Sequence, residues 1–186
     1  MINIQTFSLM NPVSDKYGFM VAYPQGYGIA APGYSWADGR NTSADQDGID
    51  DVGFINKLMD TLIANYNIDT AHIYVCGFSN GGFMTQRLAC ESPERFAAIA
   101  GLGCTMDTML YAHCKPSKPI PMMYFNGTAD PAMPYTGGAM QNPEVTPVVP
   151  VDTAVQFWVK HNNCKTVVPV DNIADSTTDD SSTAQM

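Results

Sequence analysis

Hydrophobic residues change their spacing several times along the chain, and each change predicts a secondary-structure element. Val52, Ile55 and Met59 recur at helical spacing after an aspartate that can cap a helix. Shorter unbroken apolar runs predict buried strands. The predicted strands are 19–23, 72–76, 96–102 and 120–125, and the predicted helices are 10–17, 51–66, 82–90 and 151–162. Because the two kinds of element alternate, we expect an α/β fold with a mostly parallel sheet and helices on both faces.

The length of 186 residues predicts a single domain that is large enough to bury a core. We place this domain at residues 1–170. Residues 171–186 are rich in Asp, Ser and Thr and are expected to form a polar tail or loop. Residues 24–49, rich in Gly, Ala, Asp, Ser and Asn, are expected to form one long loop, a feature that is often functional in compact domains.

Charge excludes two classes of partner. The formal net charge is −9, and only nine residues are Lys or Arg, without any basic cluster. Nucleic acid and anionic membrane surfaces are therefore not expected as partners. No apolar run approaches the roughly 20 residues of a membrane helix, and residues 1–5 show no signal peptide. The oligomeric state is left open.

The five cysteines have no C-x-x-C spacing and no neighbouring pair of histidines, so no metal site is expected. Cys104 and Cys114 lie between two predicted strands and could form a disulfide bond. The alternative is that the cysteines are buried free thiols, and we expect this of Cys76.

Residues 77–81 read Gly-Phe-Ser-Asn-Gly between a predicted strand and a predicted helix. A Gly-x-Ser-x-Gly element in this context is typical of a nucleophile elbow, in which the serine stands on a strained strand-to-helix turn. Ser79 is thus the candidate nucleophile, and the helix N-terminus behind it would favour developing negative charge. The alternative is a glycine-rich turn with an ordinary serine.

A serine nucleophile needs a base and an acid that orients the base, and in α/β-hydrolases the acid precedes the histidine. Asp130 follows a predicted strand, so it should lie at the same sheet edge as Ser79. The alternative is a locally hydrogen-bonded Asp-Pro turn. His72 and His161 fall at the opposite edge, whereas His113 could reach the edge that carries Ser79. The alternative, which is the more common case, is that His113 is a solvated loop histidine.

Five ordered segments together resemble the polyhydroxybutyrate depolymerase and feruloyl esterase type of α/β-hydrolase. They are 23–26 (Tyr-Pro-Gln-Gly), 35–40 (Ser-Trp-Ala-Asp-Gly-Arg), 50–55 (Asp-Asp-Val-Gly-Phe-Ile), 77–84 (Gly-Phe-Ser-Asn-Gly-Gly-Phe-Met) and 127–131 (Gly-Thr-Ala-Asp-Pro). The resemblance implies Ser79 as nucleophile, Asp130 as triad acid and the backbone N–H of Asn80 as an oxyanion donor. It further implies a secreted or periplasmic carboxylic ester hydrolase that acts on feruloyl, acetyl or polyhydroxyalkanoate-type esters without cofactor or metal.

Two parts of the family pattern lie outside the matched segments: an oxyanion loop before the first helix and a histidine segment near the C-terminus. We therefore expect a truncated α/β-hydrolase domain, that is, a fragment of a longer esterase. The competing hypotheses are a non-catalytic binding module with an α/β-hydrolase fold and an inactive fragment without its histidine.

Two aromatic residues are candidates for substrate binding. Trp36 in the long loop and Tyr135 just after the acid could line a cleft and stack on a phenolic ring or sugar. Ordinary packing of these side chains is the alternative. Asp38 and Arg40 could form a local ion pair that holds the long loop, and contact with substrate is the less common alternative.

Overall fold

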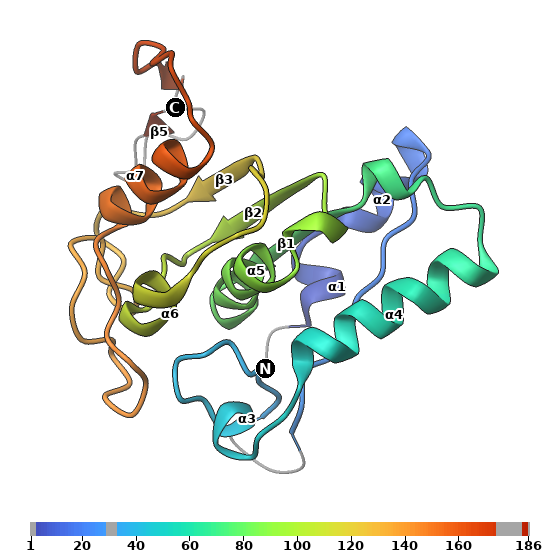
Figure 1. The fold of residues 1–186 in the computed structure, drawn as a ribbon, viewed down its shortest axis with the longest axis horizontal. Coiled ribbons are helices and arrows are strands. Elements are labelled where there is room, and N and C mark those ends of the chain that lie inside the picture. The colour runs from blue at the N-terminus through green and yellow to red at the C-terminus, as the bar shows by residue number, and fades with distance from the viewer. Residues whose placement is uncertain (1–2, 29–32, 174–183, 186) are drawn as a thin grey trace.

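The computed structural model describes residues 3–28, 33–173 and 184–185. Within them four helices come first, and strands and α-helices then alternate from β1 to α7 (Figure 1). The α-helices are α1 (Ile4–Phe7), α2 (Met10–Tyr17), α3 (Ser43–Gln46), α4 (Asp51–Asn65), α5 (Asn80–Glu91), α6 (Thr108–His113) and α7 (Val151–His161). The strands are β1 (Tyr74–Phe78), β2 (Ala98–Leu102), β3 (Met122–Phe125), β4 (Asn172–Ile173) and β5 (Ala184–Gln185), and short 3-10 helices span Thr70–His72 and Pro93–Arg95.

Strands β1, β2 and β3 form a parallel sheet in chain order. Gly77 of β1 stands opposite Gly101 of β2, and Leu102 of β2 stands opposite Phe125 of β3. Two hydrogen bonds continue the ladder just past the strand ends, from Ser79 N to Leu102 O and from Gly103 N to Phe125 O. The segments that follow the three strands therefore meet at one edge of the sheet.

Helices α4, α5 and α7 contribute side chains to the main hydrophobic core on one face of the sheet. A buried hydrogen-bonded group joins three elements there: the Trp158 indole N–H lies 3.1 Å from both Gln86 Oε1 and the Tyr124 hydroxyl. The Tyr124 hydroxyl also donates to Gln86 Oε1 at 2.6 Å. The main core consists of Val52, Ile55, Met59, Met84, Leu88, Ala89, Phe96, Ile99, Met106, Ile120, Val149, Ala154 and Trp158.

The opposite face of the sheet is also apolar but less covered. Phe7 of α1 packs against Phe78, with 5.2 Å between the ring centroids. Tyr74, Met123 and Phe125 on this face each keep more than half of their surface exposed. The described residues thus form a parallel α/β sheet with its larger core on one side, as expected for a truncated α/β-hydrolase.

Most of the predicted elements are present, with shifted ends. Helix α2 closes on Gly18, which adopts a left-handed conformation with φ of 70°. Helix α4 begins after Asp50, whose side chain accepts a hydrogen bond from Gly53 N. The predicted strand 19–23 is wrong. This segment forms no strand, because no other described strand lies alongside to pair with it, and Phe19 and Met20 are about half exposed.

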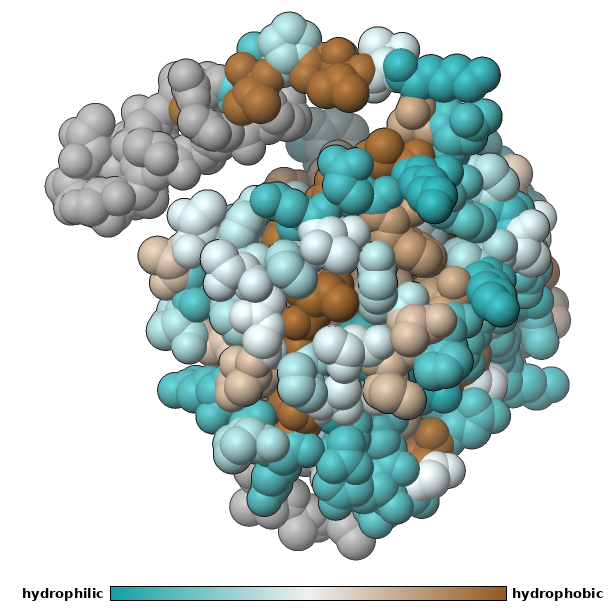
Figure 2. All heavy atoms as spheres, turned by 60° about the vertical axis from the view of Figure 1, so that its left-hand side comes forward, coloured by the Kyte–Doolittle hydropathy of each residue, from teal (hydrophilic) through white to brown (hydrophobic). Residues whose placement is uncertain are grey.

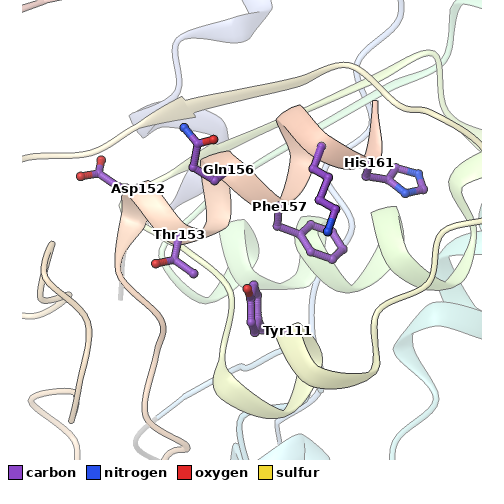
Figure 3. A pocket seen from close by; sticks show the side chains of 7 residues that line it. Tyr111, Asp152, Thr153, Gln156, Phe157 and His161 are labelled. Atoms are coloured by element: carbon purple, nitrogen blue, oxygen red, sulfur yellow. The ribbon is translucent and has the colours of Figure 1, made fainter. Parts of the chain in front are cut away.

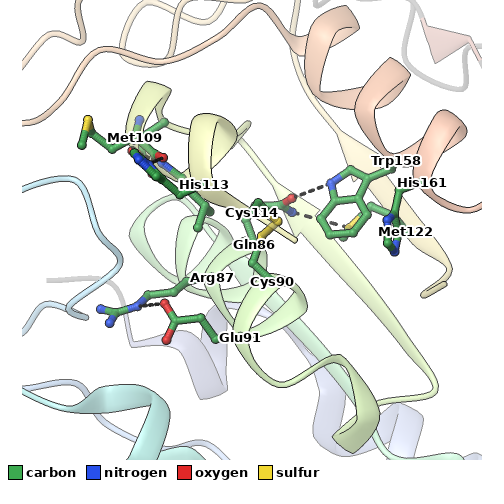
Figure 4. The surroundings of a disulfide bond; sticks show 12 residues. Gln86, Arg87, Cys90, Glu91, Met109, His113, Cys114, Met122, Trp158 and His161 are labelled. Carbon is green, nitrogen blue, oxygen red and sulfur yellow. Dashed lines mark hydrogen bonds and ion pairs between the residues drawn. A yellow bond between two sulfur atoms is a disulfide. The ribbon is translucent and has the colours of Figure 1, made fainter. Parts of the chain in front are cut away.

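The disulfide bond joins Cys90 to Cys114, so the predicted pair of Cys104 and Cys114 is wrong. Cys90 lies near the end of α5 and Cys114 follows α6, and their Cα atoms are 5.2 Å apart (Figure 4). Cys104 is a free, fully buried thiol. Cys76 is free but exposed, since its side chain lies on the less covered face of the sheet, which corrects the expectation of a buried thiol.

The C-terminal segment is described only in part. Strands β4 and β5, of two residues each, pair in antiparallel fashion, and the rest of the predicted tail at 171–186 lies mainly outside the described residues. None of the helices in the described ranges is long and apolar enough to cross a membrane.

Candidate active site

Ser79 stands at the turn between β1 and α5, as the elbow hypothesis predicts. Its backbone has φ of 52° and ψ of −120°, a conformation that residues with a Cβ rarely adopt. Its N–H is bound to Leu102 O, its carbonyl accepts from Phe83 N, and its side chain is exposed. The serine hydroxyl is therefore presented at the carboxyl edge of the sheet, before the first turn of α5.

Two glycines allow α5 to approach the sheet this closely. A Cβ on Gly77 would lie 2.1 Å from the carbonyl oxygen of Gly81, and a Cβ on Gly82 would lie 2.8 Å from Cys104 Sγ. By contrast, a Cβ on Gly81 would meet nothing nearer than Trp36 Nε1 at 3.9 Å. The tight packing therefore depends on Gly77 and Gly82 and much less on Gly81.

Asn80 begins α5 directly after Ser79. No acceptor among the described residues binds its backbone N–H, which leaves this group available to a ligand. Its side chain is fully engaged: Oδ1 accepts from Trp36 N at 2.7 Å, and Nδ2 donates to Trp36 O at 3.1 Å and to Asp38 Oδ2 at 2.5 Å. The long loop is thus fastened to the first residue of the helix behind Ser79.

The predicted ion pair between Asp38 and Arg40 is confirmed and is buried. The Arg40 Nη2 lies 2.6 Å from Asp38 Oδ2, and Nε contacts both carboxylate oxygens. The Arg40 guanidinium also lies over the ring of Phe83, 3.5 Å from its centroid, which is a cation–π contact. Burial raises the pKa of Asp38, and the Arg40 hydrogen bonds oppose this effect.

Other buried carboxylates surround the same loop. Asp51, at the start of α4, accepts from Ala37 N at 2.7 Å, and burial raises its pKa. Asp107 caps α6 through Oδ1, while Oδ2 is buried without a hydrogen-bond partner, and burial raises its pKa as well. These carboxylates do not form a metal site, since no group of three or more His, Cys, Asp or Glu in the described ranges could hold an ion.

Asp130 lies in the loop after β3, at the same sheet edge as Ser79. Its Oδ1 accepts hydrogen bonds from Ala132 N at 2.8 Å and Met133 N at 3.0 Å, as an Asp-Pro turn would provide. Its Oδ2 forms no hydrogen bond with any described residue and points toward Gly103, which follows β2. The carboxylate is therefore anchored by one oxygen and leaves the other available at the edge.

The three histidines lie away from Ser79. His72 precedes β1, where its Nδ1 lies 2.7 Å from Asp69, and His161 ends α7 beside Lys118 O, before β3 begins. His113 precedes Cys114, which is bonded to Cys90 near the far end of α5 (Figure 4). Cys90 lies 11 positions after Ser79 along α5, or roughly 16 Å away. His113 therefore does not reach the edge, and it is an exposed histidine, as the more common alternative states.

The two candidate substrate-binding aromatics are both partly buried. The Trp36 ring stacks on Phe54 with 6.4 Å between centroids, and the Tyr135 hydroxyl lies 3.1 Å from Asp152 Oδ1. Asp152 lies at one end of an open groove of about 620 Å³ between α6 and α7 (Figure 3). On that side of the molecule the apolar surface forms separate patches among polar residues (Figure 2). The groove is lined by Tyr111, Asp152, Thr153, Gln156, Phe157, Lys160 and His161.

The sequence did not predict the side-chain contacts of Asn80, which join residues 44 positions apart. The signal was present in the ordered segments 35–40 and 77–84, but nothing in either segment shows that they meet. The burial of Asp107 was not predicted either, because an aspartate before a short helix is most often an exposed cap.

Comparison with known proteins agrees with this geometry. A protein of Nocardia uniformis subsp. tsuyamanensis named NocK and described as an esterase is 34% identical over 72% of this chain and 38% of its own length. Feruloyl esterase B of Piromyces equi is 30% identical over 62% of the chain and 22% of its length. The poly(3-hydroxybutyrate) depolymerase of Ralstonia pickettii is 35% identical over 47% of the chain and 18% of its length.

The chain thus spans less than half the length of these relatives. The similarity to feruloyl esterases and polyhydroxybutyrate depolymerases that the ordered segments predict is confirmed. Residues 5–136, which include the elbow, the long loop and Asp130, match the prolyl oligopeptidase family. The chain belongs to this family and has part of an α/β-hydrolase fold.

Proposed function

We propose that this chain carries the nucleophile and the acid of a serine carboxylic ester hydrolase. The observation on which this rests is the elbow itself, with a strained, exposed Ser79 before an Asn80 N–H that no described residue binds. In the proposed reaction the Ser79 oxygen attacks the ester carbonyl and the alcohol leaves. Water then hydrolyses the acyl-enzyme and regenerates the serine.

The remaining groups take roles that fit their positions. The Asn80 N–H donates to the oxyanion of the tetrahedral intermediate, and the free oxygen of Asp130 holds the imidazole that acts as base. Since none of the three histidines of this chain lies beside Ser79, we propose that the imidazole comes from outside these 186 residues. No cofactor or metal is required by this chemistry.

For substrates, we propose feruloyl, acetyl or polyhydroxyalkanoate-type esters. The names of the relatives, which include a feruloyl esterase and a poly(3-hydroxybutyrate) depolymerase, support this class. Following the resemblance of the ordered segments, we also propose a secreted or periplasmic location.

The test measures hydrolysis of p-nitrophenyl acetate and methyl ferulate by the protein produced from its complete gene. We expect hydrolysis that is lost in Ser79→Ala and reduced by several orders of magnitude in Asp130→Asn. Absence of hydrolysis, or hydrolysis that persists in Ser79→Ala, would contradict the proposal and favour a non-catalytic module.

A serine-directed fluorophosphonate probe tests where the base comes from. We expect the folded chain of 186 residues to react no faster than its Ser79→Ala variant, since it lacks an imidazole at the elbow. Labelling that depends on Ser79 in this chain would show that a working base lies within it.

Trp36 and Tyr135 are proposed to line the acyl or alcohol side of the cleft. Stacking of an aromatic ring contributes about 0.5–1.5 kcal/mol, so Trp36→Ala should lower the preference for methyl ferulate over acetate about 2- to 10-fold. Tyr111→Ala, in the groove between α6 and α7, is the matched control and should leave the ratio unchanged. An unchanged ratio in Trp36→Ala would assign that side chain to packing alone.

A further inference from the structure

The long loop and the elbow helix are joined at the residue that carries the proposed oxyanion donor. The Asn80 side chain pairs with both the N–H and the carbonyl of Trp36, much as a neighbouring strand would. Its third hydrogen bond is to Asp38, whose carboxylate is fully buried. Because the side chain is held from three directions, the backbone of Asn80 has little freedom to rotate.

Asp38 is itself held in place by Arg40. Three side-chain hydrogen bonds of 2.6–3.1 Å and one from Arg40 N at 3.1 Å hold the carboxylate. The guanidinium then rests on Phe83, which lies one turn after Asn80 on α5. The loop therefore contacts the first turn of α5 at two points, and Phe83 N in turn binds the carbonyl of Ser79.

We propose that Asp38 and Arg40 are positioning residues that aim the Asn80 N–H at the oxyanion. They act through the Asn80 side chain and contact neither substrate nor reacting atoms. The inference rests on the proposed function, and it assigns to the buried ion pair a role in catalysis beyond the holding of a loop.

We expect the buried ion pair of Asp38 and Arg40 to contribute to the rate of the reaction more than to stability. Replacement of a buried ion pair by apolar residues is often neutral or stabilising, so the pair adds little net stability. An oxyanion donor, in contrast, contributes 10²–10³-fold to kcat, and its effect depends on aim at the developing charge and much less on binding the ground state. A loosened Asn80 should therefore lower kcat and leave KM nearly unchanged.

The decisive experiment exchanges the amide of Asn80 and the carboxylate of Asp38, first at Asn80 alone and then at both positions, in the protein produced from the complete gene. In Asn80→Asp the new carboxylate faces Asp38 where an N–H···O bond of 2.5 Å stood, and we expect kcat to fall about 10-fold or more. Adding Asp38→Asn removes the repulsion between the two carboxylates and returns the net charge to that of wild type, and we expect part of the kcat to return, because the donation to Trp36 O and the ion pair with Arg40 stay lost. Asn80→Ala, which breaks the link without repulsion, should lower kcat while KM stays within about twofold.

Arg87→Met is the matched control. Arg87 also joins α5 to this loop, through a 2.6 Å bond from Nη1 to Ala37 O, but two turns beyond Ser79. It should lower stability without a change in kcat. Denaturation midpoints show that each variant is folded, and Asn80→Ala keeps the test valid if Asn80→Asp alone does not fold.

The outcomes separate the two proposals. Wild-type protein without Ser79-dependent hydrolysis would overturn the proposed function and this inference with it. Wild-type hydrolysis combined with kcat within about twofold of wild type in Asn80→Ala would overturn this inference alone.

Discussion

Gly77→Ala is the sharpest test of the elbow, because the two motif glycines have opposite surroundings. A Cβ on Gly77 would lie 2.1 Å from the oxygen, 2.3 Å from the carbon of the Gly81 carbonyl and 2.7 Å from Gly82 N. All three are backbone atoms, so no side-chain rotation relieves the overlap. Ordinary contact begins near 3.4 Å, and the first turn of α5 would have to withdraw by about 1.3 Å to reach it.

That withdrawal is opposed on both sides. β1 is paired residue by residue with β2, and the start of α5 is bound to Trp36 and Asp38 through Asn80. Overpacking of a well-packed core costs typically 1–3 kcal/mol, and contact with immovable backbone belongs at or above the upper end. We expect Gly77→Ala to lower the free energy of unfolding by about 3 kcal/mol or more, which corresponds to about 6–12 °C in Tm for a chain of this size.

Gly81→Ala supplies the internal control. Its nearest neighbour would be Trp36 Nε1 at 3.9 Å, and alanine gains up to about 1 kcal/mol over glycine within a helix. This variant should be as stable as wild type or more stable in thermal and urea unfolding followed by circular dichroism. If Gly77→Ala unfolds within about 1 kcal/mol of Gly81→Ala, α5 is not packed against β1 as closely as described.

Three further predictions concern strain, the disulfide and a buried charge. Ser79→Gly should be about 1 kcal/mol more stable than Ser79→Ala in urea unfolding, since only glycine adopts φ of 52° and ψ of −120° without strain; equal stability would argue against that strain. Reduction of Cys90–Cys114, which closes a loop across 24 positions, should lower the free energy of unfolding by about 3 kcal/mol, whereas Cys164→Ser should show the same dependence on reductant as wild type. Burial raises the pKa of Asp107, so its stabilising contribution is present below pH 3.8 and is lost as the pH rises through its folded-state value. Asp107→Asn should therefore be more stable than wild type at pH 7, by up to about 1–3 kcal/mol, and this advantage should disappear in unfolding measured at pH 3.5.

The spacing of apolar residues, together with capping residues and glycines at helix ends, was sufficient to predict most of the fold. Helix α4 has a clear apolar stripe and an aspartate cap, and helix α2 ends on a glycine, so both were predictable from local sequence. The elbow was predictable because a Gly-x-Ser-x-Gly segment was flanked by the right elements. Strand β1 begins two residues later than predicted, since His72 belongs to a 3-10 turn capped by Asp69.

The predictions that failed were those that depended on contacts between distant segments of the chain. The run 19–23 has the composition of a strand, but a strand needs a neighbour to bind its backbone groups. The disulfide was misassigned because spacing along the chain does not reveal that the ends of α5 and α6 lie together. The role of Asn80 depends likewise on the long loop folding back onto α5, and the loop's own composition gives no sign of this.

The presentation of Ser79 is a property of the fold and does not depend on a base. A strained backbone persists only when its surroundings over-determine it. Here the sheet binds the N–H of Ser79, helix α5 binds its carbonyl, and the hydrogen bonds of the Asn80 side chain with Trp36 and Asp38 fix the next residue. A binding module gains nothing from a serine kept at this cost, whereas a nucleophile gains exposure and a free N–H beside it. The geometry of the elbow therefore agrees better with the proposed nucleophile than with a non-catalytic serine.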